Sequence, residues 1–200
     1  MRYYATLLAL TFATLLSACS GKSPLSGKKE AQPATAPSPA AAVSKTKPVR
    51  PVIRIHAAMD KPFTDSAGNV WQASTGFKDG ETIDRDPNLP VANTSDPAMY
   101  RVERYELTSF ALPVPNGKYV VKLHFAETYE EITGPGQRIF SMKVENVELK
   151  DLDIFVKAGG RQRAYVESVP VEVTDGQLDI TFTPKEQNTM INALEIIPAS

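Results

Sequence analysis

The chain has 200 residues, one cysteine and a formal net charge of −1, from 22 basic and 23 acidic residues. Because the charge is nearly balanced, a nucleic-acid partner, which requires a basic surface, is not expected. A single cysteine excludes a disulfide within the chain. The part from Val52 onward, about 149 residues, is long enough for one hydrophobic core.

Residues 1–18 have the layout of a lipoprotein signal peptide. Arg2 precedes an apolar run from Tyr3 to Leu16, which is too short to span a bilayer as a stable helix. The run ends in Leu16-Ser17-Ala18-Cys19, which resembles the bacterial lipobox, where cleavage leaves the cysteine as a lipidated N-terminus. A plain secretory signal and a buried apolar helix are the alternatives.

The lipobox resemblance implies lipidation of Cys19 and a membrane attachment in the bacterial cell envelope. More than one acyl chain makes such an attachment stable. Ser20 follows the cysteine in place of an acidic residue, which favours the outer membrane. We therefore expect a lipid-anchored protein of the envelope.

Residues 19–51 are expected to be a disordered tether that begins at the lipidated Cys19. The segment is rich in Ala, Pro, Ser and Lys and has no hydrophobic periodicity, so it cannot bury enough apolar surface to offset its ordering entropy. It carries about +5, against about −7 for residues 52–200. We interpret this basic excess as an aid to solubility.

Residues 52–200 show a series of short strand patterns and no apolar stripe of helical length. Alternation is clearest in Lys118–Ala126, where every second residue is apolar. The strands predicted in this way are Val52–Ala58, Val70–Gln72, Tyr105–Val114, Lys118–Ala126, Ile139–Glu145, Tyr165–Val173, Gln177–Thr183 and Met190–Ile197. Asp175-Gly176 predicts a hairpin turn. The pattern predicts an all-β fold, an antiparallel β-sandwich or jelly roll.

A binding surface is predicted where the Lys118–Ala126 strand ends. Pro115-Asn116-Gly117 is a turn before the strand, and Glu127-Thr128-Tyr129 follows it, ahead of a loop with Gly134-Pro135-Gly136. An aromatic ring and carboxylates at the end of a rigid sheet are typical of a preformed binding site.

Four segments in order resemble the malectin family: Met99–Tyr105, Leu123–Tyr129, Lys150–Phe155 and Ile191–Ile196. The resemblance covers nearly all of residues 52–200 and implies a malectin-like β-sandwich that binds carbohydrate without catalysis. The family's namesake is a lectin that holds a glucose disaccharide. By this resemblance, Tyr105 and Tyr129 are the aromatic residues expected to contact sugar.

Three positions depart from the namesake's pattern. Glu130 stands where it has a second aromatic, the region of Arg85 stands where it has a tyrosine, and Gln187-Asn188 stand where it has an aspartate. We take Arg85, Glu127, Glu130, Gln187 and Asn188 as candidate polar partners of the sugar. Two functions remain open: binding of a glucose-containing oligosaccharide, or a structural or protein-interaction domain that has lost sugar binding.

Enzymatic activity is not expected. Glycosidases use two carboxylates at a set separation, and the acids at Glu127, Glu130 and Glu131 are typical of a solvated loop, with no second acid indicated elsewhere. His56 and His124 fall on the polar positions of their strands, with no serine or cysteine nucleophile beside them.

No cofactor or metal is expected either. Asp84-x-Asp86-x-Asn88 has the alternate spacing of calcium loops, but Leu89-Pro90 stands where such a loop needs its glycine. The expected partners are an oligosaccharide or polysaccharide, the membrane through the lipid anchor, and an unidentified envelope protein.

Overall fold

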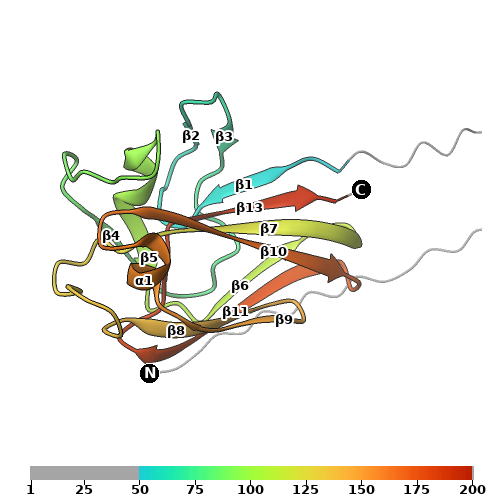
Figure 1. Ribbon diagram of the computed structural model, residues 1–200. Helices are drawn as coiled ribbons and strands as arrows, with labels where there is room; N and C mark the ends of the chain where they lie inside the picture. Colours follow the sequence, from blue (N-terminus) through green and yellow to red (C-terminus); the bar gives the residue numbers. More distant parts are fainter. Residues whose placement is uncertain (1–49, 200) are drawn as a thin grey trace, which may run out of the picture. The chain divides into compact units, whose positions relative to one another are not determined.

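Two antiparallel four-stranded sheets face each other across a hydrophobic core (Figure 1). The structure is a computed structural model, and it describes residues 50–199. The first sheet has the order β1 (Ile53–His56), β13 (Ala193–Pro198), β7 (Gly117–Ala126), β10 (Ala164–Val173). The second has the order β6 (Ser109–Pro113), β11 (Gln177–Glu186), β8 (Ile139–Val144), β9 (Val147–Leu152). The predicted all-β antiparallel sandwich is confirmed.

Alternation along β7 places one face of the first sheet in this core. Tyr119, Val121, Leu123 and Phe125 are each at most 2% exposed, as the period-2 pattern predicts. The second sheet faces them with further buried apolar side chains, which include Phe110, Phe140, Met142, Leu178 and Ile180. One continuous core therefore joins the two sheets.

A smaller group of elements covers one end of the first sheet on its outer face. β4 (Glu81–Asp84), β5 (Val102–Tyr105) and β12 (Met190–Ile191) form a three-stranded sheet, and β2 (Phe63–Thr64) pairs with β3 (Val70–Trp71). The 3-10 helix η1 (Pro97–Tyr100) precedes β5. Trp71, Met99 and Tyr100 from this group pack with Ala126 and Ala193 of the first sheet in a second, smaller apolar cluster.

The prediction of one strand over Tyr105–Val114 is wrong. Tyr105 ends β5 and Ser109 begins β6, and these strands belong to different sheets. The chain changes direction at Glu106, whose φ is 57°. The sequence carries one sign of this break: the apolar residues change parity, from Tyr105 and Leu107 to Phe110, Leu112 and Val114.

The predicted strand Met190–Ile197 also divides, at Asn192, into β12 and β13. Asn192 is fully buried, and its side chain forms hydrogen bonds with the backbone of two other strands. Oδ1 accepts from Ala126 N at 2.8 Å, and Nδ2 donates to Val102 O at 3.0 Å. A side chain that bonds to the backbone in this way competes with the regular sheet.

Asp175-Gly176 does not close a hairpin, so this prediction is also wrong. β10 pairs with β7, whereas β11 pairs with β6 and β8, and the turn therefore carries the chain from one sheet to the other. A turn is present at this position, and Gly176 adopts a φ of 86° there. The two strands pair in different sheets, and the turn residues carry no information about strand pairing.

Strands β2, β4 and β9, all of β5 but Tyr105, and the helices η1 and α1 (Ile154–Ala158) were not predicted. Helix α1 is set by its ends: the Asp153 carboxylate accepts from Val156 N at 3.0 Å, and Gly159 closes it with a φ of 77°. A helix of one and a half turns is too short to show an apolar stripe.

None of the described residues forms a helix with the length and apolarity needed to cross a membrane. The predicted signal peptide and most of the predicted tether, residues 1–49, lie outside the described residues.

The two histidines of β1 and β7 are buried, although the strand pattern places them on the polar positions of their strands. His56 is fully buried and His124 is 7% exposed, because the β2–β3 pair and η1 cover this end of the sheet. His56 Nδ1 accepts from the backbone N–H groups of Ala58 and Met59, so the proton sits on Nε2, which donates to Met99 O at 2.8 Å. Burial is the main cause that lowers the pKa of His56 to about 4.

We predict that His56 makes the fold sensitive to acid. Its pKa falls from 6.5 in the unfolded chain to about 4 in the fold, so its contribution to stability is present above pH 6.5 and is lost as the pH falls toward 4. In chemical denaturation, the stability advantage of wild type over His56→Gln should shrink by about 2 kcal/mol between pH 7 and pH 4.5. An advantage that does not change with pH would contradict this account.

Candidate functional site

The ends of several strands converge on a pocket of about 190 Å³ beyond the end of β7. Its wall comes from β4 and β5, the loop after β7, the residue before β8, and the loop between β11 and β12. The lining residues are Ile83, Arg85, Glu103, Tyr105, Tyr129, Arg138, Gln187 and Asn188. The pocket therefore depends on both sheets of the sandwich and on the three-stranded sheet that covers its end.

Tyr105 and Tyr129 both line this pocket and are both half-buried. Tyr105 is the last residue of β5, where it pairs with Glu81 on one side and Met190 on the other. Tyr129 follows β7, and its backbone N–H donates to Glu127 Oε1 at 3.0 Å. Each aromatic side chain is thus held by a backbone that the neighbouring strands or a buried carboxylate fix in place.

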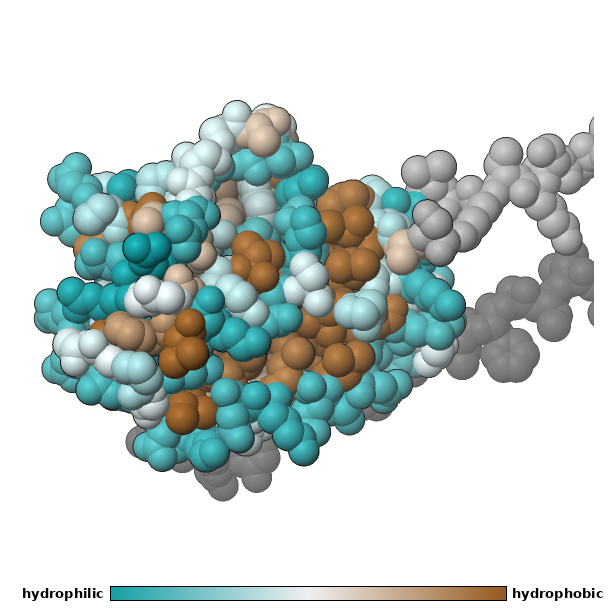
Figure 2. Space-filling view, in the orientation of Figure 1, coloured by the Kyte–Doolittle hydropathy of each residue, from teal (hydrophilic) through white to brown (hydrophobic). Residues whose placement is uncertain are grey.

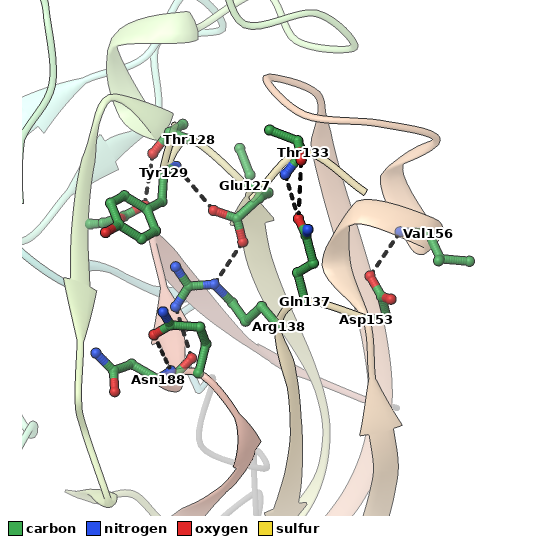
Figure 3. A network of polar contacts seen from close by, with 12 residues as sticks. Glu127, Thr128, Tyr129, Thr133, Gln137, Arg138, Asp153, Val156 and Asn188 are labelled. Carbon is green, nitrogen blue, oxygen red and sulfur yellow. Dashed lines mark hydrogen bonds and ion pairs between the residues drawn. The ribbon is translucent and has the colours of Figure 1, made fainter. Parts of the chain in front are cut away.

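Glu127 joins three parts of the pocket from beneath it (Figure 3). Its side chain is 0% exposed, and while Oε1 accepts from Tyr129 N, Oε2 accepts from Arg138 Nε at 2.6 Å. Arg138 in turn donates from Nη1 to the carbonyl oxygen of Asn188 at 2.8 Å. One buried carboxylate therefore sets the positions of Tyr129, Arg138 and the β11–β12 loop relative to one another.

A second ion pair supports the other wall. Arg85 Nη2 donates to Glu103 Oε1 at 2.6 Å, and Arg85 Nε donates to Thr128 Oγ1 at 3.3 Å. The Thr128 hydroxyl donates a hydrogen bond to Glu103 Oε2 at 2.9 Å, which closes a three-residue ring of hydrogen bonds. The Arg85 guanidinium also lies 5.6 Å from the ring centre of Tyr129.

Burial raises the pKa of Glu127, and the Arg138 guanidinium acts against this rise. Ionised Glu127 therefore depends on its partner. The pKa of Tyr129 is also raised, chiefly by the Glu131 carboxylate, so the tyrosine hydroxyl stays protonated and able to donate at neutral pH.

The structure brings together five of the seven residues predicted for sugar binding: Tyr105, Tyr129, Arg85, Gln187 and Asn188 line one pocket. Glu127 lies beneath the pocket with both oxygens occupied, and Glu130 is exposed outside its lining. The predicted lipidation site, Cys19, lies outside the described residues.

Sequence reasoning missed Ile83, Glu103 and Arg138. Ile83 and Glu103 are register partners on β4 and β5, and β4 itself was not predicted. Arg138 follows a Gly/Pro loop in which a charged residue is unremarkable. No group of three or more His, Cys, Asp or Glu among residues 50–199 is placed to hold a metal ion.

A second hollow, of about 360 Å³, is less suited to a sugar. It lies at the start of β7, beside the β8–β9 turn and β10, and Figure 2 shows hydrophobic residues gathered on the face that carries β7 and β10. Its one aromatic, Tyr119, is 2% exposed and donates its hydroxyl to Pro115 O. No aromatic face is presented there for a sugar ring to stack on.

Comparison with known proteins agrees with this geometry. The malectin domain model matches residues 52–197. The chain belongs to the malectin-domain family. It is 34% identical to Malectin-B of Xenopus laevis over 117 residues, which cover 53% of this chain and 41% of that protein, and 34% identical to human Malectin over 117 residues, 53% and 39%. The chain thus spans about two fifths of the length of the curated relatives it matches.

Solved structures share the fold of this malectin domain at low sequence identity. Bacteroides uniformis β-glucuronidase aligns with a TM-score of 0.67 and 16% identity, over 74% of this chain and 18% of that chain. The extracellular domain of ANXUR2 from Arabidopsis thaliana aligns with a TM-score of 0.65 and 17% identity, over 74% and 48%. These likenesses support the sandwich architecture alone.

We predict that Glu127 is required for the stability of this end of the fold. Glu127→Leu leaves the Arg138 guanidinium, itself 5% exposed, without its partner, and should lower the free energy of unfolding by about 3–5 kcal/mol. Glu130→Leu is the matched control, because Glu130 is exposed and its loss should change stability by less than about 0.5 kcal/mol. Equal effects of the two substitutions in chemical denaturation would show that the buried pair is not structurally important.

Proposed function

We propose that this protein is a non-catalytic carbohydrate-binding module that holds a glucose-containing oligosaccharide in the pocket of Tyr105 and Tyr129. Membership of the malectin-domain family supports a carbohydrate-binding, non-catalytic role. The observation that carries the proposal is the convergence of two half-buried tyrosines with guanidinium and amide groups in one preformed pocket. Sugar rings present C–H faces to aromatic rings and hydroxyls to such polar groups.

The size of the pocket limits what it can hold. At about 190 Å³ it is smaller than the roughly 300–1,000 Å³ of pockets that enclose drug-sized ligands. One sugar unit enters it, and the adjoining units of the oligosaccharide lie along its rim. So small a contact has few anchors, and a modest affinity follows.

We predict that Tyr129→Ala abolishes most of the glycan binding while the fold survives. Loss of a central aromatic anchor should weaken binding at least about tenfold in calorimetry with the oligosaccharide found on a glycan array. Because a lipid anchor is expected, the protein is purified in detergent. The detergent must have no sugar head group, since such a head group would compete with the glycan for the pocket. Val166→Ala is the control, since Val166 is 40% exposed on β10 and does not line the pocket.

Two results would count against this function. Binding that Tyr129→Ala and Val166→Ala reduce equally would place the site elsewhere. Absence of binding to every glycan on the array would favour the other candidate, a structural or protein-interaction domain that has lost sugar binding. The observation that favours this candidate is the exposed Glu130, which stands where the namesake has an aromatic residue.

The proposal includes a lipid anchor at Cys19 and a place on the outer membrane of a bacterial envelope. It is supported by the apolar run and the Leu16-Ser17-Ala18-Cys19 sequence. We predict that mass spectrometry of the membrane fraction will find an N-terminal peptide that begins at a diacylglyceryl-modified Cys19, and that Cys19→Ser will prevent this modification. An unmodified Cys19 in a soluble, full-length chain would overturn the anchor.

A further inference from the structure

Arg138 brings an unoccupied hydrogen-bond donor to the pocket. Its side chain is 95% buried, Nε is bound to Glu127 and Nη1 to Asn188, and no described residue accepts a hydrogen bond from Nη2. In residues 50–199 the only sealed side-chain nitrogen or oxygen without a partner is Nη1 of Arg50, so Arg138 Nη2 is not sealed. It opens on the pocket that Arg138 lines. Figure 3 shows this guanidinium between Glu127 and Asn188, beside the ring of Tyr129.

Arg85 brings a second donor from another wall. Nε and Nη2 are bound to Thr128 and Glu103, and Nη1 has no partner among residues 50–199. The side chain is 18% exposed and lies over the Tyr129 ring. The two guanidiniums are therefore held rigidly by buried carboxylates, and each keeps N–H groups for a ligand.

The two carboxylates at this site are buried, and each of their four oxygens already accepts a hydrogen bond from the protein. Glu103 is 2% exposed, with one oxygen on Arg85 and the other on Thr128. Glu127 is fully buried and doubly bound. Asn188 donates from Nδ2 to Glu106 Oε1 at 2.9 Å and its main-chain oxygen accepts from Arg138, which leaves the neutral amide oxygen Oδ1. The charged groups that keep free hydrogen-bonding capacity at the pocket are thus the two guanidiniums, and they match a ligand group that only accepts.

We propose that the pocket selects acidic oligosaccharides, with the carboxylate of a hexuronate unit accepting hydrogen bonds from Arg138 and Arg85. The inference rests on the proposed function and names the class of sugar that the same pocket takes. Guanidinium and carboxylate form short, charge-assisted hydrogen bonds with defined geometry, which a sugar hydroxymethyl group at the same position cannot replace.

Net charge does not drive this selection. Glu103 and Glu127 already balance Arg85 and Arg138, and Glu130 and Glu131 are exposed near Tyr129. Exposed charges are screened over about 8–10 Å at physiological ionic strength, whereas contacts within the pocket are screened much less. The preference for a uronate should therefore come from hydrogen-bond geometry and persist at high salt.

The test compares matched disaccharides that differ at one carbon. Glucose disaccharides of α and β linkage are titrated calorimetrically against the same disaccharides with one glucose replaced by glucuronate, at 0.05 and 0.5 M NaCl. The uronate member of at least one pair should bind about tenfold more tightly or better, at both salt concentrations. Arg138→Lys, which keeps the charge but loses the planar fork, and Arg85→Lys should each reduce that preference to about threefold or less.

Arg163→Gln serves as the control, because Arg163 is exposed and does not line the pocket, and it should keep the full preference. The wild-type comparison needs no variant, so a failure of Arg138→Lys to fold leaves the test intact. Neutral disaccharides that bind as well as their uronate partners would overturn this inference and leave the proposed function standing. If neither member of any pair binds and no glycan on the array binds either, the proposed function itself fails.

Discussion

The buried carboxylate of Glu127 is the contact on which the functional end of this domain depends. A charged group without solvent is costly, and Glu127 is tolerated because Arg138 and the Tyr129 backbone occupy both its oxygens. The same bonds fix an aromatic ring, a guanidinium and the β11–β12 loop against one another. Ion-pair geometry here serves position more than stability, since an apolar pair would fill the space but would set no direction for the side chains above it. The buried hydrogen bonds of Glu127 and Arg138 thus fix the side chains and the loop that line the pocket.

The layer of short strands over the first sheet explains why the pocket lies where it does. Strands β4, β5 and β12 extend the sandwich at one end only, and they bring Arg85 and Tyr105 next to the loop that follows β7. The adjoining β2–β3 pair and η1 bury His56 and His124. At the other end the sheets carry no such layer, and the hollow there is lined by side chains without a free aromatic face. Binding capacity thus follows from an asymmetry between the two ends of one sandwich.

The sequence predicted the sandwich because its inner strands alternate strongly, as β7 does, with partners on both sides. It did not predict β4 or β9, which lie at the edges of their sheets, are short and are rich in charged residues. Tyr129 was predicted from its place at the end of the clearest strand pattern and again by family resemblance, whereas Tyr105 was predicted by family resemblance alone. Glu103 and Arg138 were missed for a physical reason: their partners, Arg85 and Glu127, are 18 and 11 residues away, and only the folded chain brings each pair together. The burial of the histidines likewise depends on a layer built from distant residues.

The pairing of β13 has a consequence for how the domain is made. The last strand of the fold is inserted between β1 and β7, with Ile196 opposite both Ile53 and Val121. An inner strand of the first sheet is therefore the last strand of the domain to be synthesised. Until it is in place, the backbone of β1 is held, within residues 50–199, only by its bridge to Gln72, and β7 has an open edge. Open edges of this kind pair readily with other chains. The first sheet therefore closes only after β13 has been made, and pairing across so long a stretch of chain is slow by comparison with folds built from local contacts.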